Sequence, residues 1–469
     1  MSGFVSFVGA GPGDIGLITE KGIRRLKSAD VVLYDRLANP RLLRFTKPDC
    51  RLVYCGKLPD RHVMRQDMIN RALTDFALQG LQVVRLKGGD PSVFGRVGEE
   101  AKALKEAGIE YEIVPGVTAS VAAASYAGIP VTHRDYSTSF TVRTGHYCSN
   151  STGKINESVK NADTIAYYMG IKNLPAHCDQ LIKDGLPSTT KIAVVEWATT
   201  GKQRTVEGSL ETINEKVISN KIQNPAMVII GDVVSMRKEL AWYEKKPLLG
   251  KRLLIAKASP SESEIERYFL DSGAEAYAFP TLTMKKTKLS NEDVEHITGS
   301  GRLIFTAPES IDIVMESLLE AGFDVRDLPR WIGCLSEKTL QALRLKGIIG
   351  HKLQKTEANS VVVGPESQQF NVTFSTHRIV RDQRFKELEE RLLAEEKWET
   401  VVFPNRSSVD WFTQEADAAG LPLSLLKFAY IGNQVKAYAE EKGFQEIDEE
   451  IQREIESWKT NRSKVVSAG

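Results

Sequence analysis

The chain is poor in cysteine and histidine. Its 469 residues include five cysteines and seven histidines. The two nearest cysteines, Cys50 and Cys55, are separated by four residues, and no second pair follows that could complete a zinc site. An odd and scattered set of this kind is typical of reduced thiols in the cytoplasm. We therefore expect a cytoplasmic protein without a metal site.

Long hydrophobic runs and an excess of charge of one sign are missing as well. No apolar run approaches the length of a membrane span, and a net charge of +1 gives no general attraction to nucleic acid or to membranes. No basic segment precedes the first apolar stretch, so we expect no signal peptide. The hydrophobic content of 42% and charged content of 26% are typical of a soluble globular protein. The length predicts roughly two to four domains.

The stretch 83–100, VVRLKGGDPSVFGRVGEE, is the most informative part of the sequence. Its apolar start predicts a buried strand, and Gly88 and Gly89 then allow close approach of a ligand because they lack a Cβ. Pro91 has no N–H and stiffens the loop, while Asp90 adds a negative charge, so the loop is poorly suited to phosphate. This pattern favours a neutral or cationic ligand held by carbonyl groups. The alternative is an ordinary turn between a strand and a helix.

A second glycine-rich turn, GAGPGD at 9–14, follows an apolar strand. With a helix after it and Asp35 about twenty residues further on, it resembles the dinucleotide fingerprint, which would indicate a nicotinamide-dependent oxidoreductase. Two details count against that interpretation. Pro12 removes an amide from the turn, and Asp14 would repel a pyrophosphate.

Strands alternate with helices as far as about residue 243, which indicates an α/β architecture. Strands are expected at 4–8, 30–35, 51–57, 83–86, 111–114, 164–170, 192–200 and 225–234. The helix at 121–127 is built of very small residues, which predicts either close approach of a ligand or tight helix–sheet packing. Two histidines and two arginines between 133 and 146 favour an anion-binding wall, although each could be structural. A charged segment with proline and glycine, 245–251, is the expected linker.

The second half contains an internal repeat. A strand at 303–305 and a helix precede a second strand at 332–335 and a helix that closes on Gly347, and the same order recurs between residue 401 and Gly443. Two copies of one unit predict a two-lobed α/β domain with a cleft between its lobes. The polar tail beyond about Asp448 predicts a final helix with frayed ends.

The first half, about residues 3–243, resembles uroporphyrinogen-III C-methyltransferases. The resemblance rests on the order and spacing of several motifs: VGAGPGD, VVLYDR, VVRLKGGDPSVFGRVGEE, VPGVTAS, YAGIPVTHR, RTGH, YYMG, VEWATTGKQR and PAMVIIGDVV. Val97 departs from them, since the family usually has glycine there. The resemblance implies a two-lobed tetrapyrrole-methyltransferase fold over 1–244, with lobes of about 1–115 and 116–244. It also implies a homodimer formed through this half.

The same resemblance implies a reaction. Two methyl groups pass from S-adenosyl-L-methionine to uroporphyrinogen III, which gives precorrin-2 through precorrin-1 and releases S-adenosyl-L-homocysteine. A related methyltransferase acting on a later corrinoid is the nearest alternative. The sulfonium of the cofactor is a cation without phosphate, which agrees with the loop chemistry inferred above.

Site residues follow by motif match. The cofactor pocket is expected to be lined by Pro12, Gly88, Gly89, Asp90, Val93, Thr118, Ala119, Met169 and Ala198. Because the tetrapyrrole carries eight carboxylates, cations should hold it, and the candidates are Arg36, His62, Arg96 and Arg134. The match makes Asp35 the catalytic base and Lys57 the acid, with Arg96 also at the catalytic centre. The alternative for Asp35 and Lys57 is a surface carboxylate and a solvated lysine.

The second half, 252–460, is more faintly similar to uroporphyrinogen-III synthases, through LIFTAPES, IGCLS and the repeat. Two features depart from that family. The segment 359–397 is short and polar, and Val435 stands where a hydroxyl residue is usual. The resemblance implies a synthase-like domain that closes hydroxymethylbilane to uroporphyrinogen III. The alternative is a tetrapyrrole-binding or structural appendage without catalysis.

Overall fold

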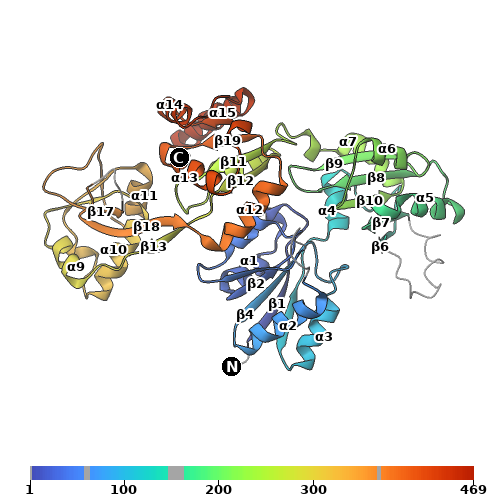
Figure 1. Cartoon of the computed structure of the whole chain (residues 1–469), viewed down its shortest axis with the longest axis horizontal. Coiled ribbons are helices and arrows are strands. Elements are labelled where there is room, and N and C mark those ends of the chain that lie inside the picture. Colours follow the sequence, from blue (N-terminus) through green and yellow to red (C-terminus); the bar gives the residue numbers. More distant parts are fainter. Residues whose placement is uncertain (1–2, 57–63, 146–162, 367–370, 469) are drawn as a thin grey trace.

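The computed structural model describes residues 3–56, 64–145, 163–366 and 371–468. Within these ranges the strands form four sheets, each accompanied by helices (Figure 1). The predicted α/β class is therefore confirmed. Lys57, His62 and His146 lie outside the described residues.

The first lobe is a parallel five-stranded sheet in the order β3-β2-β4-β1-β5. Its strands are β1 (Phe4–Gly9), β2 (Val31–Tyr34), β3 (Arg51–Tyr54), β4 (Gln82–Lys87) and β5 (Glu110–Val114). Its helices are α1 (Glu20–Ser28), α2 (Gln66–Leu78) and α3 (Val97–Glu106), with the 3₁₀ segment η2 (Pro40–Phe45). Val5 and Phe7 join the core on the side of α2 and α3, whereas Val8 joins the core that contains Leu26 of α1. The sheet is covered on both faces, which explains the continuous apolar runs of its strands.

The second lobe is a mixed sheet in the order β6-β7-β10-β8-β9. Its strands are β6 (Phe140–Thr144), β7 (Thr164–Tyr168), β8 (Lys191–Glu196), β9 (Arg204–Ser209) and β10 (Ala226–Ile230). Its helices are α4 (Ala119–Tyr126), α5 (Leu174–Lys183), α6 (Ile213–Ser219) and α7 (Arg237–Leu240). Ala123, Ala124 and Ala127 share a buried cluster with Ala166 and Ala193. The small residues of α4 therefore serve tight helix–sheet packing, one of the two interpretations that the sequence left open.

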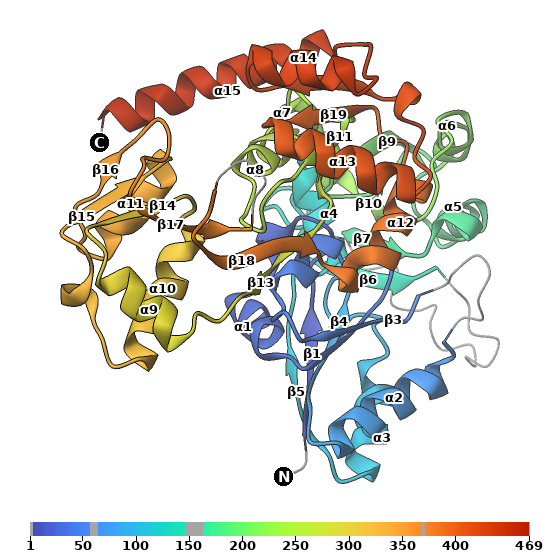
Figure 2. The ribbon, with the colours of Figure 1, turned by 60° about the vertical axis from the view of Figure 1, so that its left-hand side comes forward.

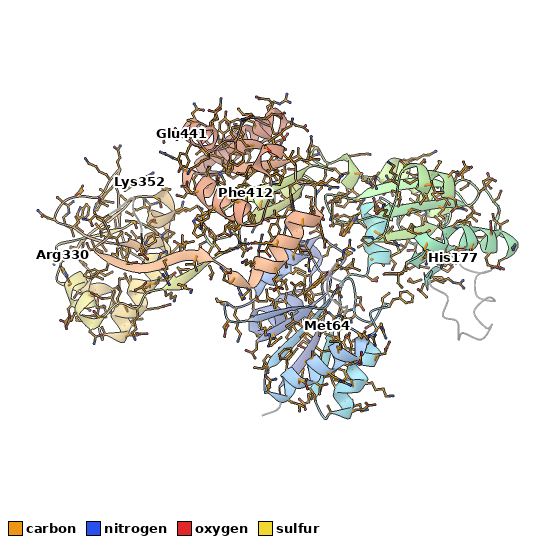
Figure 3. All side chains as sticks on the ribbon, in the orientation of Figure 1. Met64, His177, Arg330, Lys352, Phe412 and Glu441 are labelled. Atoms are coloured by element: carbon orange, nitrogen blue, oxygen red, sulfur yellow. The ribbon has the colours of Figure 1, made fainter. Side chains whose placement is uncertain are left out.

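The second half has two sheets, and the two copies of the repeat fall in different lobes. One sheet is parallel, β12-β11-β19-β20, with β11 (Arg252–Ala256), β12 (Glu275–Phe279), β19 (Thr400–Phe403) and β20 (Lys427–Tyr430). Its helices are α8 (Glu264–Asp271), α12 (Lys386–Glu395), α13 (Arg406–Ala418), α14 (Asn433–Glu441) and α15 (Glu449–Ala468). Phe412 of α13 belongs to its core (Figure 3).

The other sheet of this half has the order β13-β18-β17-β14-β15-β16. Its strands are β13 (Leu282–Lys286), β14 (Arg302–Phe305), β15 (Trp331–Cys334), β16 (His351–Lys352), β17 (Val361–Pro365) and β18 (Phe374–Arg381). Its helices are α9 (Asn291–Thr298), α10 (Glu309–Glu320) and α11 (Glu337–Leu345). The chain enters and leaves this lobe through the antiparallel pair β13 and β18. The predicted two-lobed arrangement is thus present, and Figure 2 shows the terminal helix α15 running from the α14 side toward β16.

The two halves share one buried core. Leu42 and Leu43 of η2 belong to the same cluster as Phe385 and Leu388 near the start of α12. In the segment expected as a linker, 245–251, Leu248 is buried, with 1% of its surface exposed. In the described part of the chain no helix is long and apolar enough to cross a bilayer.

Candidate active site

Three loops meet at the carboxyl ends of β1, β4 and β5. Gly11 and Gly89 exchange backbone hydrogen bonds, with N···O distances of 2.7 Å from Gly89 to Gly11 and 3.2 Å in return. Gly116, after β5, lies so close that a Cβ on it would stand 2.4 Å from the carbonyl oxygen of Gly89 and 2.8 Å from the Cα of Gly9. Only glycine allows this approach. In an open α/β sheet the carboxyl ends of the strands are where ligands bind.

Asp90 fastens two of these loops together. One carboxylate oxygen accepts a hydrogen bond from the amide of Ser92 at 2.7 Å, and the other accepts from the amide of Gly116 at 2.9 Å. From the negative charge of Asp90 the sequence analysis predicted a neutral or cationic ligand at this place. The structure adds that the same carboxylate fixes the shape of the loop.

The second lobe supplies two further loops, after β7 and β8. Gly13 packs against Ala198, Thr199 and Thr200, and the hydroxyl of Thr199 accepts a hydrogen bond from the amide of Asp14 at 3.0 Å. Residues other than glycine have positive φ here, namely Met169 (54°), Trp197 (45°) and Thr199 (67°). Such conformations cost energy and are held by their surroundings, and they gather at functional sites.

An apolar surface borders the loops. The phenol of Tyr168 accepts a hydrogen bond from the amide of Ser120 at 2.9 Å, and a second hydrogen bond joins it to the hydroxyl of Thr118. The ring of Phe94 stands 5.1 Å from that of Tyr168. Phe94, Met169 and Leu37 are 44%, 41% and 53% exposed. Large exposed apolar side chains beside polar loops are typical of a ligand-binding surface.

The structure brings most predicted cofactor residues together and places Asp35, Arg36 and Arg96 on the adjoining loops. Asp35 follows β2, where its carboxylate lies 3.7 Å from a guanidinium nitrogen of Arg85. The guanidinium carbon of Arg36 lies 5.9 Å from the centre of the Trp197 ring. Arg96, with φ of 57°, caps α3 and forms an exposed ion pair with Glu99 at 2.6 Å. Arg134 is exposed, and within the described residues no hydrogen bond or ion pair joins it to the other candidates.

A buried ionic cluster beneath the site was missed by sequence reasoning. The ammonium of Lys87 lies 2.9 Å from both carboxylate oxygens of Glu100, which is fully buried, and Arg85 lies 3.5 Å from the same carboxylate. Burial, together with the nearby charge of Arg85, lowers the pKa of Lys87. Two cations beside the apolar residues of β4 were a usable signal, because buried charges require partners.

Comparison with known proteins identifies the family. Uroporphyrinogen-III C-methyltransferase of Bacillus subtilis (strain 168) is 41% identical over 430 residues, which cover 90% of this chain and 89% of that protein. The chain belongs to the uroporphyrinogen-III C-methyltransferase family. The family model for Tetrapyrrole (Corrin/Porphyrin) Methylases matches residues 5–214. Porphyrin biosynthesis protein HemD of Ruminiclostridium josui is 36% identical over 354 residues, or 74% of this chain and 70% of that protein.

Solved structures are similar to the first half. The crystal structure of uroporphyrin-III C-methyl transferase from Thermus thermophilus, complexed with S-adenyl homocysteine, is 36% identical. The aligned part covers 50% of this chain and 99% of the Thermus thermophilus chain, with a TM-score of 0.43.

For a member of the uroporphyrinogen-III C-methyltransferase family, the nicotinamide interpretation of the first glycine turn is wrong. The structure gives a physical reason. A dinucleotide turn leads straight into a helix whose free amides hold the pyrophosphate. Here the carboxylate of Asp14 accepts the hydrogen bond of the Gly16 amide at 2.7 Å, and α1 begins only at Glu20.

Proposed function

We propose that residues 1–244 transfer two methyl groups from S-adenosyl-L-methionine to uroporphyrinogen III, giving precorrin-1 and then precorrin-2. The observation that carries this proposal is the junction of Gly11, Gly89 and Asp90, which offers carbonyls and a carboxylate and has little free amide for phosphate. A sulfonium cation suits that chemistry. The family name of the relatives supports the choice of tetrapyrrole.

The residues present fit such a cofactor. Gly89 has φ of 69°, and a Cβ placed on it would meet nothing nearer than the amide nitrogen of Ala119, 3.8 Å away. The loop therefore leaves open space beside Gly89. When bound, S-adenosyl-L-methionine supplies an electrophilic methyl group. Pro12, Gly88, Val93, Thr118, Met169 and Ala198 complete the proposed pocket from the adjoining loops.

The protein's own contribution is mainly to orient the substrate and exclude water. Arg36, Arg96, Arg134 and His62 are proposed to hold substrate carboxylates, with Arg96 next to the reacting carbons. Asp35 is proposed to accept the proton that leaves the methylated carbon, and Lys57 to act as the acid. Arg85, at 3.7 Å from Asp35, helps to keep that carboxylate in place.

Product analysis tests the reaction. The full chain is incubated with uroporphyrinogen III and S-adenosyl-L-methionine, and the expected product carries two added methyl groups. Turnover of a later corrinoid in place of uroporphyrinogen III would overturn the proposed substrate.

We also propose a homodimer formed through 1–244, which the mass of the protein in solution tests. A cytoplasmic location is proposed as well, and cell fractionation tests it.

Replacing Arg96 by alanine is expected to lower turnover of the tetrapyrrole about tenfold or more, while S-adenosylhomocysteine affinity stays within a few-fold. A charged hydrogen bond to a substrate carboxylate is worth about 1.5–3 kcal/mol. Arg96 is exposed and its partner Glu99 is equally exposed, so the pair is weak and can open for a substrate. Steady-state kinetics of Arg96→Ala and Glu99→Gln check this. Glu99→Gln should keep most activity, and equal loss of cofactor affinity in Arg96→Ala would make Arg96 a pocket-building residue.

We also propose that residues 252–460 bind a linear tetrapyrrole and close it to uroporphyrinogen III. A cleft of about 910 Å³ supports this second function. It opens at the carboxyl ends of β11 and β19, and it is lined by Lys257 and Arg462 on one lobe and Lys338 on the other. Val435, the departure noted from the sequence, is 7% exposed in the core of its lobe. Its apolar side chain is explained by packing.

An isomer assay separates the alternatives for the second half. Hydroxymethylbilane is supplied to the full chain without S-adenosyl-L-methionine, and the type III isomer is expected. If only the uncatalysed type I isomer forms while a tetrapyrrole still binds, the half is an appendage without catalysis.

Binding of a polycarboxylate to this cleft is expected to weaken as the pH rises from 7 to 9. Burial, together with the neighbouring charge of Arg44, lowers the pKa of Lys257 to about 8. Its ammonium is therefore mostly charged at pH 7 and mostly neutral at pH 9, whereas an ordinary lysine stays charged. Fluorescence titration with uroporphyrin at several pH values measures the effect. Lys257→Met should bind more weakly at pH 7 and lose the pH dependence, and Lys338→Met should keep it.

A further inference from the structure

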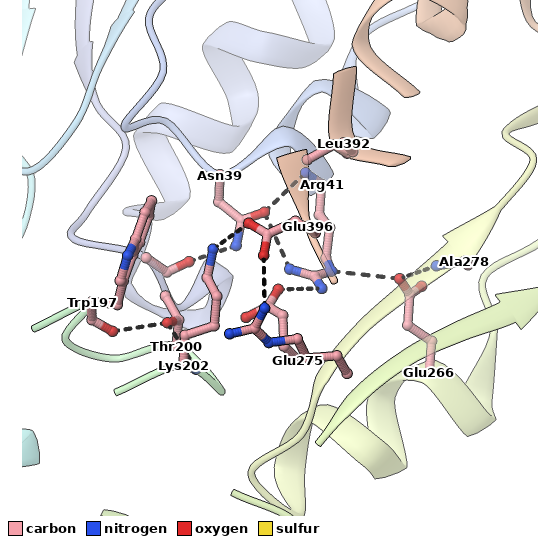
Figure 4. Close-up of polar contacts among 12 residues, drawn as sticks. Asn39, Arg41, Trp197, Thr200, Lys202, Glu266, Glu275, Ala278, Leu392 and Glu396 are labelled. Atoms are coloured by element: carbon pink, nitrogen blue, oxygen red, sulfur yellow. Dashed lines mark hydrogen bonds and ion pairs between the residues drawn. The ribbon is translucent and has the colours of Figure 1, made fainter. Parts of the chain in front are cut away.

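The two cofactor loops contributed by Gly13 and by Trp197–Lys202 are held from outside by the second half of the chain. Figure 4 shows the polar contacts that link them to residues of α8 and β12 and to Glu396, which directly follows α12. Two separate routes cross the boundary between the halves.

The first route ends on Lys202. Its ammonium lies 2.5 Å from a carboxylate oxygen of Glu396, directly after α12, and 3.7 Å from the centre of the Trp197 ring. The Lys202 and Glu396 side chains are 12% and 18% exposed, so water screens the pair only in part. Arg252 of β11 lies 3.8 Å from the second oxygen of Glu396. The carboxylate of Glu396 in the second half is thus linked through Lys202 to Trp197, the residue with positive φ that precedes Ala198.

The second route ends on the carbonyl of Gly13. The side-chain amide of Asn39 donates to that carbonyl at 2.6 Å, and the Asn39 oxygen accepts from the backbone of Arg41 at 3.0 Å. The guanidinium of Arg41 donates to Glu275 of β12 at 2.9 Å and lies 3.5 Å from Glu266 of α8. The side chain of Arg41 is only 6% exposed.

A close backbone approach joins the two routes. The carbonyl of Gly201 accepts a hydrogen bond from the amide of Gly250 at 2.9 Å. A Cβ on Gly201 would lie 2.1 Å from the backbone nitrogen of Glu275, so the loop after β8 rests directly on β12. Its other side rests on Gly13, through Thr199 and Thr200. The loops are therefore clamped between the two halves.

We infer that Glu396, Lys202, Glu275 and Arg41 are positioning residues of the methyltransferase site, so that the second half shapes the pocket that holds S-adenosyl-L-methionine. This inference rests on the proposed function. At an ordinary interface between two domains, charge pairs would only hold the two surfaces together. Here both pairs end on loops that line the proposed pocket, on Trp197 beside Ala198 and on Gly13 beside Pro12.

Calorimetric titration of the full chain with S-adenosylhomocysteine tests the inference. Glu396→Ala should raise the dissociation constant about five- to tenfold while kcat changes less than about twofold, since coupling between sites is usually of that size. The charge exchange Lys202→Glu with Glu396→Lys should recover most of the affinity. Glu275→Gln should also weaken affinity. The control is Glu316→Ala, because Glu316 of α10 pairs with Lys286 of β13 at 2.6 Å, in the lobe formed around β13 to β18.

Amide hydrogen exchange gives a second readout. In Glu396→Ala the amides of 197–203 should exchange faster than in Glu316→Ala, with the core strands unchanged. If Glu396→Ala does not fold, Lys202→Met is measured in its place. Unchanged affinity and unchanged exchange in the folded variants would overturn the inference. Absence of S-adenosylhomocysteine binding in the unaltered chain would instead overturn the proposed function.

Discussion

Replacing Asp90 by alanine is expected to weaken binding of S-adenosylhomocysteine by about tenfold or more. Its carboxylate accepts backbone hydrogen bonds from Ser92 and Gly116, and each bond to a charged acceptor is worth about 1.5–3 kcal/mol. Because Gly116 lies against Gly9 and Gly89, loss of its bond releases three loops of the pocket together. The negative charge that favours a sulfonium is lost as well. Isothermal titration of the full chain measures the change.

A matched control exists in the same half of the chain. The carboxylate of Asp163 also accepts backbone hydrogen bonds, from Thr138 at 2.7 Å and Ser139 at 3.1 Å, but it stands before β7, at the end opposite to Met169. Asp163→Ala should therefore leave the affinity unchanged. Asp90→Asn should fall between the unaltered chain and Asp90→Ala, because it keeps acceptor oxygen but no charge. Equal affinities of Asp90→Ala and the unaltered chain would show that Asp90 has no part in the pocket.

The architecture was predictable wherever local patterns and tertiary packing agree. β1 and β2 are buried on both faces, so their sequences are almost continuously apolar and stand out. α1 begins where Thr19 caps it, with the hydroxyl accepting from the amide of Gly22. β6 and β9 were missed because they lie at the two edges of their sheet and contain many polar residues.

The residues of the candidate site could be predicted from the sequence more fully than the contacts that bring them together. The glycines and Asp90 stand in one short stretch, and their chemistry follows from residue type alone. Their contacts with Gly11 and Gly116 depend on pairing between strands far apart in the sequence. The positive φ of Met169, Trp197 and Thr199 has no local sign, since none is glycine. Such conformations are imposed by surrounding structure.

The support from the second half lay beyond sequence reasoning for a related reason. Residues 245–251 have the composition of a linker, and that pattern predicts separation between domains. The contact surfaces on both sides are instead apolar, with Leu42 and Leu388 in one core, and they are bordered by pairs such as Arg44 with Glu266. Complementarity between two surfaces is visible only after each has folded. The two halves of this chain are therefore joined by a common buried core as well as by the peptide chain that connects them.

Replacing Lys87 by methionine is expected to destabilise the first lobe by about 3–5 kcal/mol, because removing one partner leaves the buried carboxylate of Glu100 with only Gln66 and Arg85 beside it. Glu100 is fully buried and receives two contacts of 2.9 Å from Lys87. Arg85 remains 3.5 Å away but also serves Asp35, so it replaces Lys87 only in part. Since a chain with several lobes does not unfold in one step, amide hydrogen exchange in β1 and β4 is the proper measurement of local stability.

Two comparisons make this prediction sharp. Lys47→Met removes a similar ion pair, with Asp30 at 2.5 Å, but that pair is about one-third exposed, so the expected loss is at most about 1 kcal/mol. The double variant Lys87→Met with Glu100→Leu removes both charges and should recover much of the stability, because apolar replacement of a whole buried pair is often neutral. If the double variant is as unstable as Lys87→Met, the loss comes from packing. If Lys87→Met exchanges no faster than Lys47→Met, the buried cluster does not stabilise the sheet beneath the active site.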